Sequence, residues 1–294
     1  MKTSIFIILI ISTSLFLSCN FNKSISLNSK MNLKTQGDGI SCENISIIDN
    51  NGTEVQSPTF IYGQEIFINF NNISGFVKEN QYVFPGLKLL IVSTNNDTVL
   101  YSDDLYADNS DGFNLNPLKL TANITLASPM HSDEKYKAFL MIWDKNGIGT
   151  YNLEFQFNII HNPQITIKSK GVEYDEVYLF DNENNKAITN HLIKVQQKVF
   201  ILFEGLQGFE VQDDSILCGI SLKVVDKNNS IILDDADLMN NTKMSAQEFS
   251  TQVAPYFLVN ESSIENPLKC YCLIWDKKSD KSISADFSVN IARE

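Results

Sequence analysis

The sequence predicts an all-β protein that contains two β-sandwich domains in tandem. Two parts of the chain repeat one another at a spacing of about 130 residues, and each repeat has short apolar segments between turns rich in Asn and Asp. No long segment shows the period of an amphipathic helix, and 43% hydrophobic residues is too many for a disordered chain. The length of 294 residues suits two domains of ~100–200 residues each.

The internal repeat is the strongest of these observations. Residues 64–105 align without a gap with residues 197–238 at an offset of 133, with 14 identities in 42 positions. Residues 137–159 align with residues 269–291 at an offset of 132, with 8 identities in 23 positions. Co-linear matches of this density indicate that one unit was duplicated and joined near residues 161–163.

Each unit is expected to form about seven strands. Residues 65–70 place Ile66, Ile68 and Phe70 on one face by the strand period of two. The other expected strands of the first unit cover residues 87–92, 99–101, 136–143 and 151–159. Asn and Asp, which tolerate positive φ, occupy the turns between them. The second unit repeats this plan, and its stretch 238–257 can hold a helical turn.

Residues 1–18 have the pattern of a signal peptide. Lys2 provides a positive start, an apolar run covers residues 5–17, and a serine followed by Cys19 ends the segment. The run is shorter than the ~20 residues of a membrane-spanning helix. Its end resembles the lipobox of bacterial lipoproteins, although Phe16 stands where Leu is usual. The resemblance implies that Cys19 is acylated and begins the mature chain; the alternative is an ordinary secretory signal that is cut nearby.

The mature chain is expected to begin with a flexible tether, residues 19–34, because this stretch is rich in Ser, Asn and Lys. The two β-sandwich repeats follow at 35–161 and 162–294. A net charge of -12 gains nothing from anionic lipid, so the lipid on Cys19 is expected to hold the protein to a membrane of the bacterial cell envelope, the outer membrane.

The closing hairpin of each unit carries a family resemblance. The turn 143–147 and the alternating strand 155–159 resemble the last hairpin of bacterial immunoglobulin-like domains, and the second unit departs by having Ser279 in place of Gly147. The resemblance implies two tandem immunoglobulin-like domains and no catalytic residues. The triplets 97–99 and 214–216 also resemble the O-glycosylation signal of the Bacteroidetes group.

Composition excludes several classes of function. The acidic balance argues against binding to nucleic acid, because phosphate affinity comes from clustered Lys and Arg. Three widely spaced His residues, His131, His161 and His191, do not favour metal or triad chemistry. Phosphate-loop, dinucleotide and hydrolase motifs are missing from the sequence. We therefore expect a protein that is not an enzyme and uses no cofactor and no metal.

Four cysteines follow Cys19, namely Cys42, Cys218, Cys270 and Cys272. None of them has a cysteine at the aligned position of the other repeat, so a disulfide is not part of the shared fold plan. Cys270 and Cys272 are two apart on an expected strand and point to the same face. Either of them could reach Cys218, or all four are buried thiols that pack like small apolar side chains.

Trp143 and Trp275 occupy equivalent positions in the two repeats. As exposed side chains they would serve as stacking platforms for a sugar ligand. The usual place of a Trp in such a domain is the core between the sheets. Trp143 shares strand parity with Phe139 and Met141, and the same pattern recurs around Trp275, which favours the core.

Asp104 and Asp237 are the aligned members of two acidic stretches. Carboxylates clustered on loops are possible ligands for calcium, which takes 6–8 oxygens. The alternative is a solvated charged loop, and no EF-hand spacing is present.

The sequence predicts a non-catalytic, membrane-anchored lipoprotein that acts in binding or adhesion, or as an accessory module of the cell envelope. A carbohydrate-binding lipoprotein of a glycan-uptake system is the alternative, and it requires aromatic side chains on an exposed face. A glycoside hydrolase and a purely structural spacer are the other classes considered. The expected partners are the membrane, through the N-terminal lipid, and a protein or glycan of unknown identity.

Overall fold

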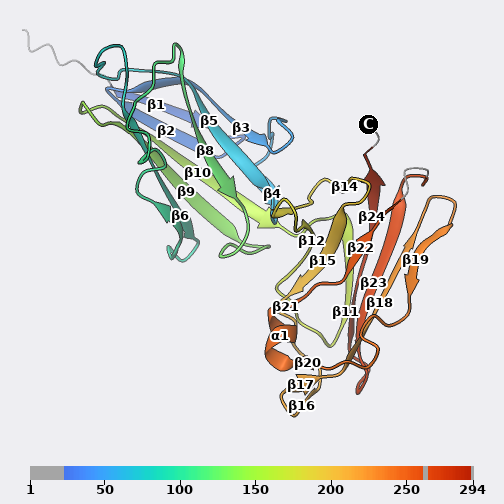
Figure 1. The fold of residues 1–294 in the computed structure, drawn as a ribbon. Coiled ribbons are helices and arrows are strands. Elements are labelled where there is room, and N and C mark those ends of the chain that lie inside the picture. The colour runs from blue at the N-terminus through green and yellow to red at the C-terminus, as the bar shows by residue number, and fades with distance from the viewer. Residues whose placement is uncertain (1–22, 261–263, 293–294) are drawn as a thin grey trace, which may run out of the picture.

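The computed structural model describes residues 23–260 and 264–292 (Figure 1). The expected signal peptide and Cys19 lie outside this range, so their assignment stays a prediction. Within the described residues, no helix combines the length and the hydropathy that crossing a membrane needs. The all-β prediction is confirmed, because two packed β-structures with separate hydrophobic cores follow each other along the chain.

The first unit packs a large sheet against a three-stranded one. The large sheet has the order β1-β2-β10-β9-β6-β7, with β4 parallel to β10, and the small sheet has the order β3-β5-β8. In chain order the strands are β1 (Lys23–Asn28), β2 (Leu33–Asp38), β3 (Ser41–Asp49), β4 (Thr59–Ile61), β5 (Glu65–Ser74), β6 (Pro85–Ser93), β7 (Thr98–Ser102), β8 (Leu118–Thr125), β9 (Lys135–Asp144) and β10 (Thr150–Ile160).

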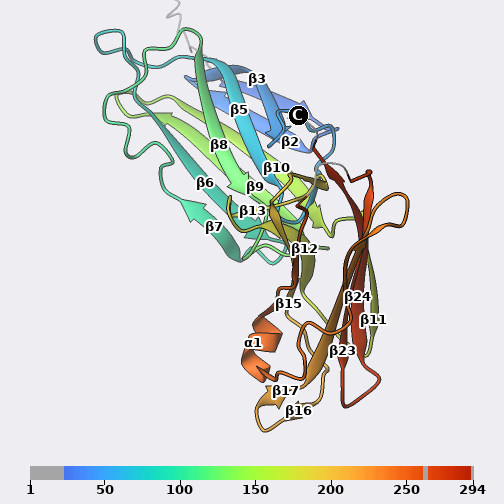
Figure 2. The ribbon, with the colours of Figure 1, turned by 45° about the vertical axis from the view of Figure 1, so that its right-hand side comes forward.

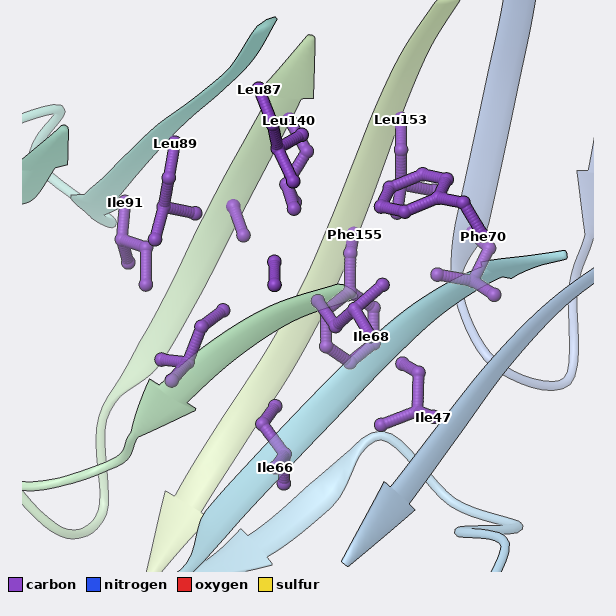
Figure 3. Close-up of a cluster of buried hydrophobic side chains, with 14 of the residues drawn as sticks. Ile47, Ile66, Ile68, Phe70, Leu87, Leu89, Ile91, Leu140, Leu153 and Phe155 are labelled. Carbon is purple, nitrogen blue, oxygen red and sulfur yellow. The ribbon is translucent and has the colours of Figure 1, made fainter. Parts of the chain in front are cut away.

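Alternate side chains of the two sheets fill the space between them. Ile66, Ile68 and Phe70 on β5 are fully buried, as their spacing predicted. Figure 3 shows these residues facing Leu87, Leu89 and Ile91 of β6, together with Leu140, Leu153 and Phe155. The opposite side chains of each large-sheet strand therefore point away from this core.

The second unit repeats the arrangement. Its large sheet has the order β11-β24-β23-β18-β19, with β14 parallel to β24. Strands β12 and β15 are the central strands of the opposing sheet. The elements are β11 (Ile165–Lys170), β12 (Glu176–Asp181), β13 (Lys186–Ala187), β14 (Leu192–Ile193), β15 (Lys198–Glu204), β16 (Val211–Gln212), β17 (Ser215–Ile216), β18 (Cys218–Val225), β19 (Ile231–Asp235), β20 (Met244–Ser245), α1 (Ala246–Thr251), β21 (Gln252–Val253), β22 (Tyr256–Leu258), β23 (Leu268–Asp276) and β24 (Ser282–Ile291).

The two units differ where the second contains a proline. Strand β8 is one continuous strand beside β5, with a shift of register between Phe70 and Ile73, whereas its counterpart is divided into β21 and β22 on either side of Pro255. Proline has no N–H to donate to a sheet ladder. The helical turn expected between residues 238 and 257 is found as α1, directly before this interruption.

The expected flexible tether at residues 19–34 is wrong for residues 23–34. Strand β1 pairs with β2 from Lys23 opposite Asp38 to Asn28 opposite Leu33. Met31 and Leu33 are buried at the end of the hairpin. Polar composition suggested a spacer, but backbone pairing does not depend on apolar side chains, and these two residues suffice to hold the hairpin on the core.

The two units contact each other through β4 and β5 on one side and β12 and β13 on the other. Tyr62 and Tyr178 pack edge to face with ring centroids 5.2 Å apart. Lys186 Nζ lies 2.9 Å from Glu65 Oε2. In both views β12 lies beside this end of the first unit (Figure 1, Figure 2). The joint is therefore a packed contact between the two domains.

Candidate functional site

Trp143 and Trp275 lie on the outward faces of the large sheets, which overturns the prediction that they occupy the cores. Both side chains are partly exposed. The buried positions of β9 are the alternate ones, Ala138, Leu140 and Ile142. Strand parity correctly grouped the residues of one face, but β9 is apolar on both faces. The pattern therefore did not reveal which face the opposing sheet covers.

Each Trp ring covers a glycine of the neighbouring strand. Gly86 is paired with Trp143 across β6 and β9, and Gly219 is paired with Trp275 across β18 and β23. A Cβ at either glycine would lie 2.1 Å from the indole ring. The missing side chain lets the indole lie against the backbone of its own sheet, which leaves it half-buried instead of free as a stacking platform.

The calcium candidates Asp104 and Asp237 each bind a lysine of their own unit. Asp104 Oδ2 lies 2.6 Å from Lys145 Nζ. Its Oδ1 accepts the backbone N–H of Leu87 at 3.0 Å and that of Tyr106 at 2.9 Å. This carboxylate joins the loop after β7 to β6 and to the turn after β9, so its oxygens already have partners.

Asp237 repeats the arrangement in the second unit. Its Oδ2 accepts a hydrogen bond from Lys277, which lowers the pKa of Asp237, and its Oδ1 accepts the backbone N–H of Met239 at 3.2 Å. The chain segments described contain no group of three His, Cys, Asp or Glu side chains placed to hold a metal ion. The contacts of both aspartates give them a structural role, and calcium binding at these positions stays an untested prediction.

The aspartate between Trp and Lys is also structural. Asp144 accepts the N–H of Val77 at 2.7 Å and that of Asn146 at 3.0 Å. The equivalent Asp276 accepts the N–H of Glu210 at 2.8 Å. All three residues of the duplicated Trp-Asp-Lys sequence therefore have structural contacts at one end of the sandwich.

The outward face of the second large sheet places an exposed aromatic ring among polar groups. Tyr271 on β23 is 43% exposed, and its neighbours across the sheet are Asp286 on β24 and Lys223 on β18. A groove of about 470 Å³ lies at this end of the face. Its lining residues include Gln164, Thr166, Lys269, Tyr271, Asp286 and Asn290. Such a face suits a ligand that has both apolar and hydrogen-bonding surfaces.

The first unit has a groove at the corresponding place, with a volume of about 430 Å³. Four lining positions are equivalent in the two repeats: Asn32, Lys137, Gln156 and Asn158 in the first, and Gln164, Lys269, Ser288 and Asn290 in the second. Two of these positions, the lysine and the last asparagine, are identical. The groove is thus a duplicated feature that lies outside the packed core.

The centre of the first face is more apolar than that of the second. A smaller groove of about 220 Å³ is lined there by Leu90, Phe139 and Met141, among others. Phe139 occupies the position of Tyr271, and Lys137 Nζ lies 5.7 Å from the centre of its ring. The two units therefore have equivalent grooves, but the side chains next to the groove differ between them.

The cysteines in the described chain are free thiols. On β23, Cys272 is opposite Leu222 of β18, whereas Cys218 is opposite Asp276, four residues further along. At ~3.4 Å per residue this separation is well beyond the ~7 Å limit for a disulfide, so the bridge considered to Cys218 is not formed. Burial raises the pKa of Cys218 to about 11 and that of Cys272 to about 12, so both stay protonated and unreactive.

Sequence reasoning missed Tyr271, Asp286 and the shared groove, because the Trp parity argument placed that face inside. A usable signal was present in Lys137 and Asn158. Both are polar, both lie within strands, and both are identical in the other repeat. Polar identities on strand positions have no packing role to explain them.

Comparisons with known proteins do not assign the chain to a family. No family model and no curated protein matches it. Among solved structures, it is similar to pT26-6p, with 7% identity, 92% of this chain and 66% of that chain covered, and a TM-score of 0.26. A calcium-binding mutant of Bacteroides uniformis β-glucuronidase 2 follows, with 8% identity, 86% and 32% covered, and a TM-score of 0.25.

A DUF3823 family protein from Bacteroides ovatus has 11% identity, 71% and 90% of the two chains covered, and a TM-score of 0.21. The chain spans less than two thirds of the length of pT26-6p and of the β-glucuronidase. At these TM-scores the likenesses carry no argument about function, which must come from the outward faces themselves.

Proposed function

We propose that the protein is a non-catalytic binding protein of the bacterial cell envelope, anchored through a lipid on Cys19. The duplicated groove on the outward sheet faces is the observation that supports binding. Residues Lys137 and Asn158 recur there as Lys269 and Asn290 although they do not build the core. The lipid fixes the chain to the membrane, and the two faces offer two similar contact surfaces to one extended partner or to two partners.

A glycan is the second candidate ligand, and the surroundings of Tyr271 favour it. The apolar C–H face of a sugar packs on an aromatic ring, while its hydroxyls need acceptors and donors close by. Asp286 and Lys223 flank the ring directly, and Asn290 lies in the same groove. This arrangement supports the glycan-uptake alternative, in which the lipoprotein would hold a polysaccharide at the cell surface.

Affinity electrophoresis and calorimetry with a panel of soluble polysaccharides would test the glycan proposal. We expect Tyr271→Ala to weaken binding of a retained glycan roughly two- to tenfold, because one aromatic contact contributes on the order of 0.5–1.5 kcal/mol. Tyr256→Ala is the matched control, since Tyr256 is 49% exposed but lies on β22 in the opposing sheet. Equal loss in both variants, or no retained glycan, would reject glycan binding at this face.

Labelling of cells with radioactive palmitate would test the anchor. Wild-type protein should carry the label and fractionate with the outer membrane, whereas Cys19→Ala should lose the label. Unchanged labelling of the Cys19→Ala variant would contradict the lipid assignment and leave the groove as an independent question.

A further inference from the structure

Strand β1 is exposed along its whole length, with its apolar side chains on the outward face of the sheet and its serines on the opposite face. Ile25 and Leu27 are 69% and 74% exposed, and they pair with Gln36 and Lys34 on the outward face of the large sheet. Ser24 and Ser26, by contrast, line a hollow shared with residues of β2 and β3. Burial in the protein core would place the two kinds of side chain the other way round. The strand therefore has an unexplained apolar surface.

This strand is also the basic end of an acidic protein. Lys23, Lys30 and Lys34 lie in the β1–β2 hairpin, and all 35 Asp and Glu residues of the chain occur at or after Asp38. Lys23 pairs with Asp38 at 3.5 Å, but both side chains are more than half exposed. Salt and water weaken such a surface pair. The hairpin itself has three Lys and one Asp, and it keeps a positive balance that complements an anionic surface although Glu154 of β10 lies opposite Lys34.

The short distance in sequence between Cys19 and β1 restricts which partner can cover the apolar surface of β1. Only three residues separate Cys19 from Lys23. Four peptide steps span at most ~14 Å, so a lipid on Cys19 would keep the start of β1 within ~14 Å of the acylated residue. The other edge of β1 pairs with no strand among the described residues.

From these three observations we propose that β1 lies on the bilayer, with Ile25 and Leu27 in the lipid interface and Lys23, Lys30 and Lys34 against anionic headgroups. The inference rests on the proposed lipid at Cys19 and extends it from a covalent anchor to a docked orientation. Side chains of this type add to an acyl chain as a second membrane signal. The groove of the first unit opens on the same outward face as Ile25 and Leu27, so it would then lie beside the membrane at a defined position.

A fluorophore that senses its environment can test this in the acylated full-length protein on vesicles. Leu27→Cys in a Cys42→Ser background offers one accessible thiol for labelling, because Cys218, Cys270 and Cys272 are buried. Ile231→Cys in the same background is the control: Ile231 is 63% exposed and lies on β19 of the second unit. Vesicles of phosphatidylcholine with added phosphatidylglycerol carry nitroxide-labelled lipids as quenchers.

We expect the label at position 27 to shift to shorter wavelength and to be quenched several-fold more strongly by nitroxide lipids than the label at position 231. Replacing the three lysines by Gln should reduce this quenching on anionic vesicles. Equal quenching at both positions would overturn the proposal. A wavelength shift at position 27 without nitroxide quenching would indicate a protein contact such as a second copy, and would overturn it too. Failure of the wild type to float with vesicles would instead reject the lipid anchor.

Discussion

Gly86 decides the position of Trp143, because the indole occupies the space where a side chain would be. The cross-strand pairing places the two residues opposite each other, and the close approach recurs at Gly219. The pair explains why the Trp-Asp-Lys sequence survives in both repeats without forming a ligand site. A glycine within a strand weakens it locally, and the packed indole offsets that cost.

Substitution Gly86→Ala should lower the free energy of unfolding of the first unit by roughly 1–3 kcal/mol, since the added methyl forces the ring away from the sheet. Urea unfolding followed by far-ultraviolet circular dichroism, a signal that does not depend on Trp143, would measure the loss. In the double variant with Trp143→Ala the combined loss should fall short of the sum of the single losses. Strictly additive losses would show that the two residues do not interact.

Helix α1 illustrates how a short element is held by its cap and one side chain. Ser245 accepts the N–H of Glu248 at 3.1 Å, and the Glu248 side chain accepts the N–H of Ser245 at 3.2 Å, which together form a capping box. Phe249 is fully buried, and its ring lies 4.6 Å from that of Phe209. The helix thus closes one side of the second core where the sheet is interrupted.

Truncation of that anchor, Phe249→Ala, should cost about 3–5 kcal/mol through lost burial and the remaining cavity. Because the two cores are separate, only the second unit should be destabilised. Hydrogen exchange read peptide by peptide would show faster exchange in β15 and β21 and unchanged exchange in β5 and β9. Tyr256→Ala, at an exposed site, is the control. Equal acceleration in both units would contradict independent cores.

The joint between the two units contains a buried carboxylate. Glu176 is 2% exposed and accepts hydrogen bonds from the backbone N–H and the hydroxyl of Ser132, both at 2.7 Å. His161 Nδ1 lies 3.3 Å from Glu176 Oε2, and His131 Nδ1 lies 4.0 Å from its Oε1. Two of the three histidines that seemed scattered in the sequence therefore meet at one carboxylate between the domains.

This geometry predicts that the joint is sensitive to pH. The hydrogen bond to Glu176 raises the pKa of His161 above its ordinary value, against the opposing effect of burial. The contribution of the pair is therefore complete below the unfolded pKa of ~6.5 and is lost as the pH rises through the raised pKa. Small-angle scattering at about pH 5.5 and about pH 8.5 should show a more variable arrangement of the two units at the higher pH.

The matched variant His161→Gln should resemble the wild type at the higher pH and should respond little to acidification. Gln carries no charge at any pH, so the variant cannot form the ion pairs of His161 with Asp133 and Glu176. An unchanged pH response in this variant would show that the joint is controlled by other groups.

Particular elements show where sequence reasoning succeeded. The alternation in residues 65–70 predicted the buried face of β5, and the repeat predicted that β6 and β18, or β9 and β23, would be equivalent. Sequence reasoning was wrong about the face of β9 on which Trp143 lies, and it was wrong about β1, which it predicted to be part of a flexible spacer. In both cases the local sequence is compatible with either outcome, and the contact partner decides.

The sequence by itself determined the strand period, the turns and the duplication, because these depend on neighbouring residues and on matches along the chain. Only the tertiary structure decided that Trp143 lies over Gly86, that Asp104 and Asp237 bind lysines, and that Ile25 and Leu27 point outward on β1. The physical reason is that burial and ion pairing are set by what packs against a strand from distant parts of the chain. A period of two distinguishes the faces of a strand without saying which one is covered.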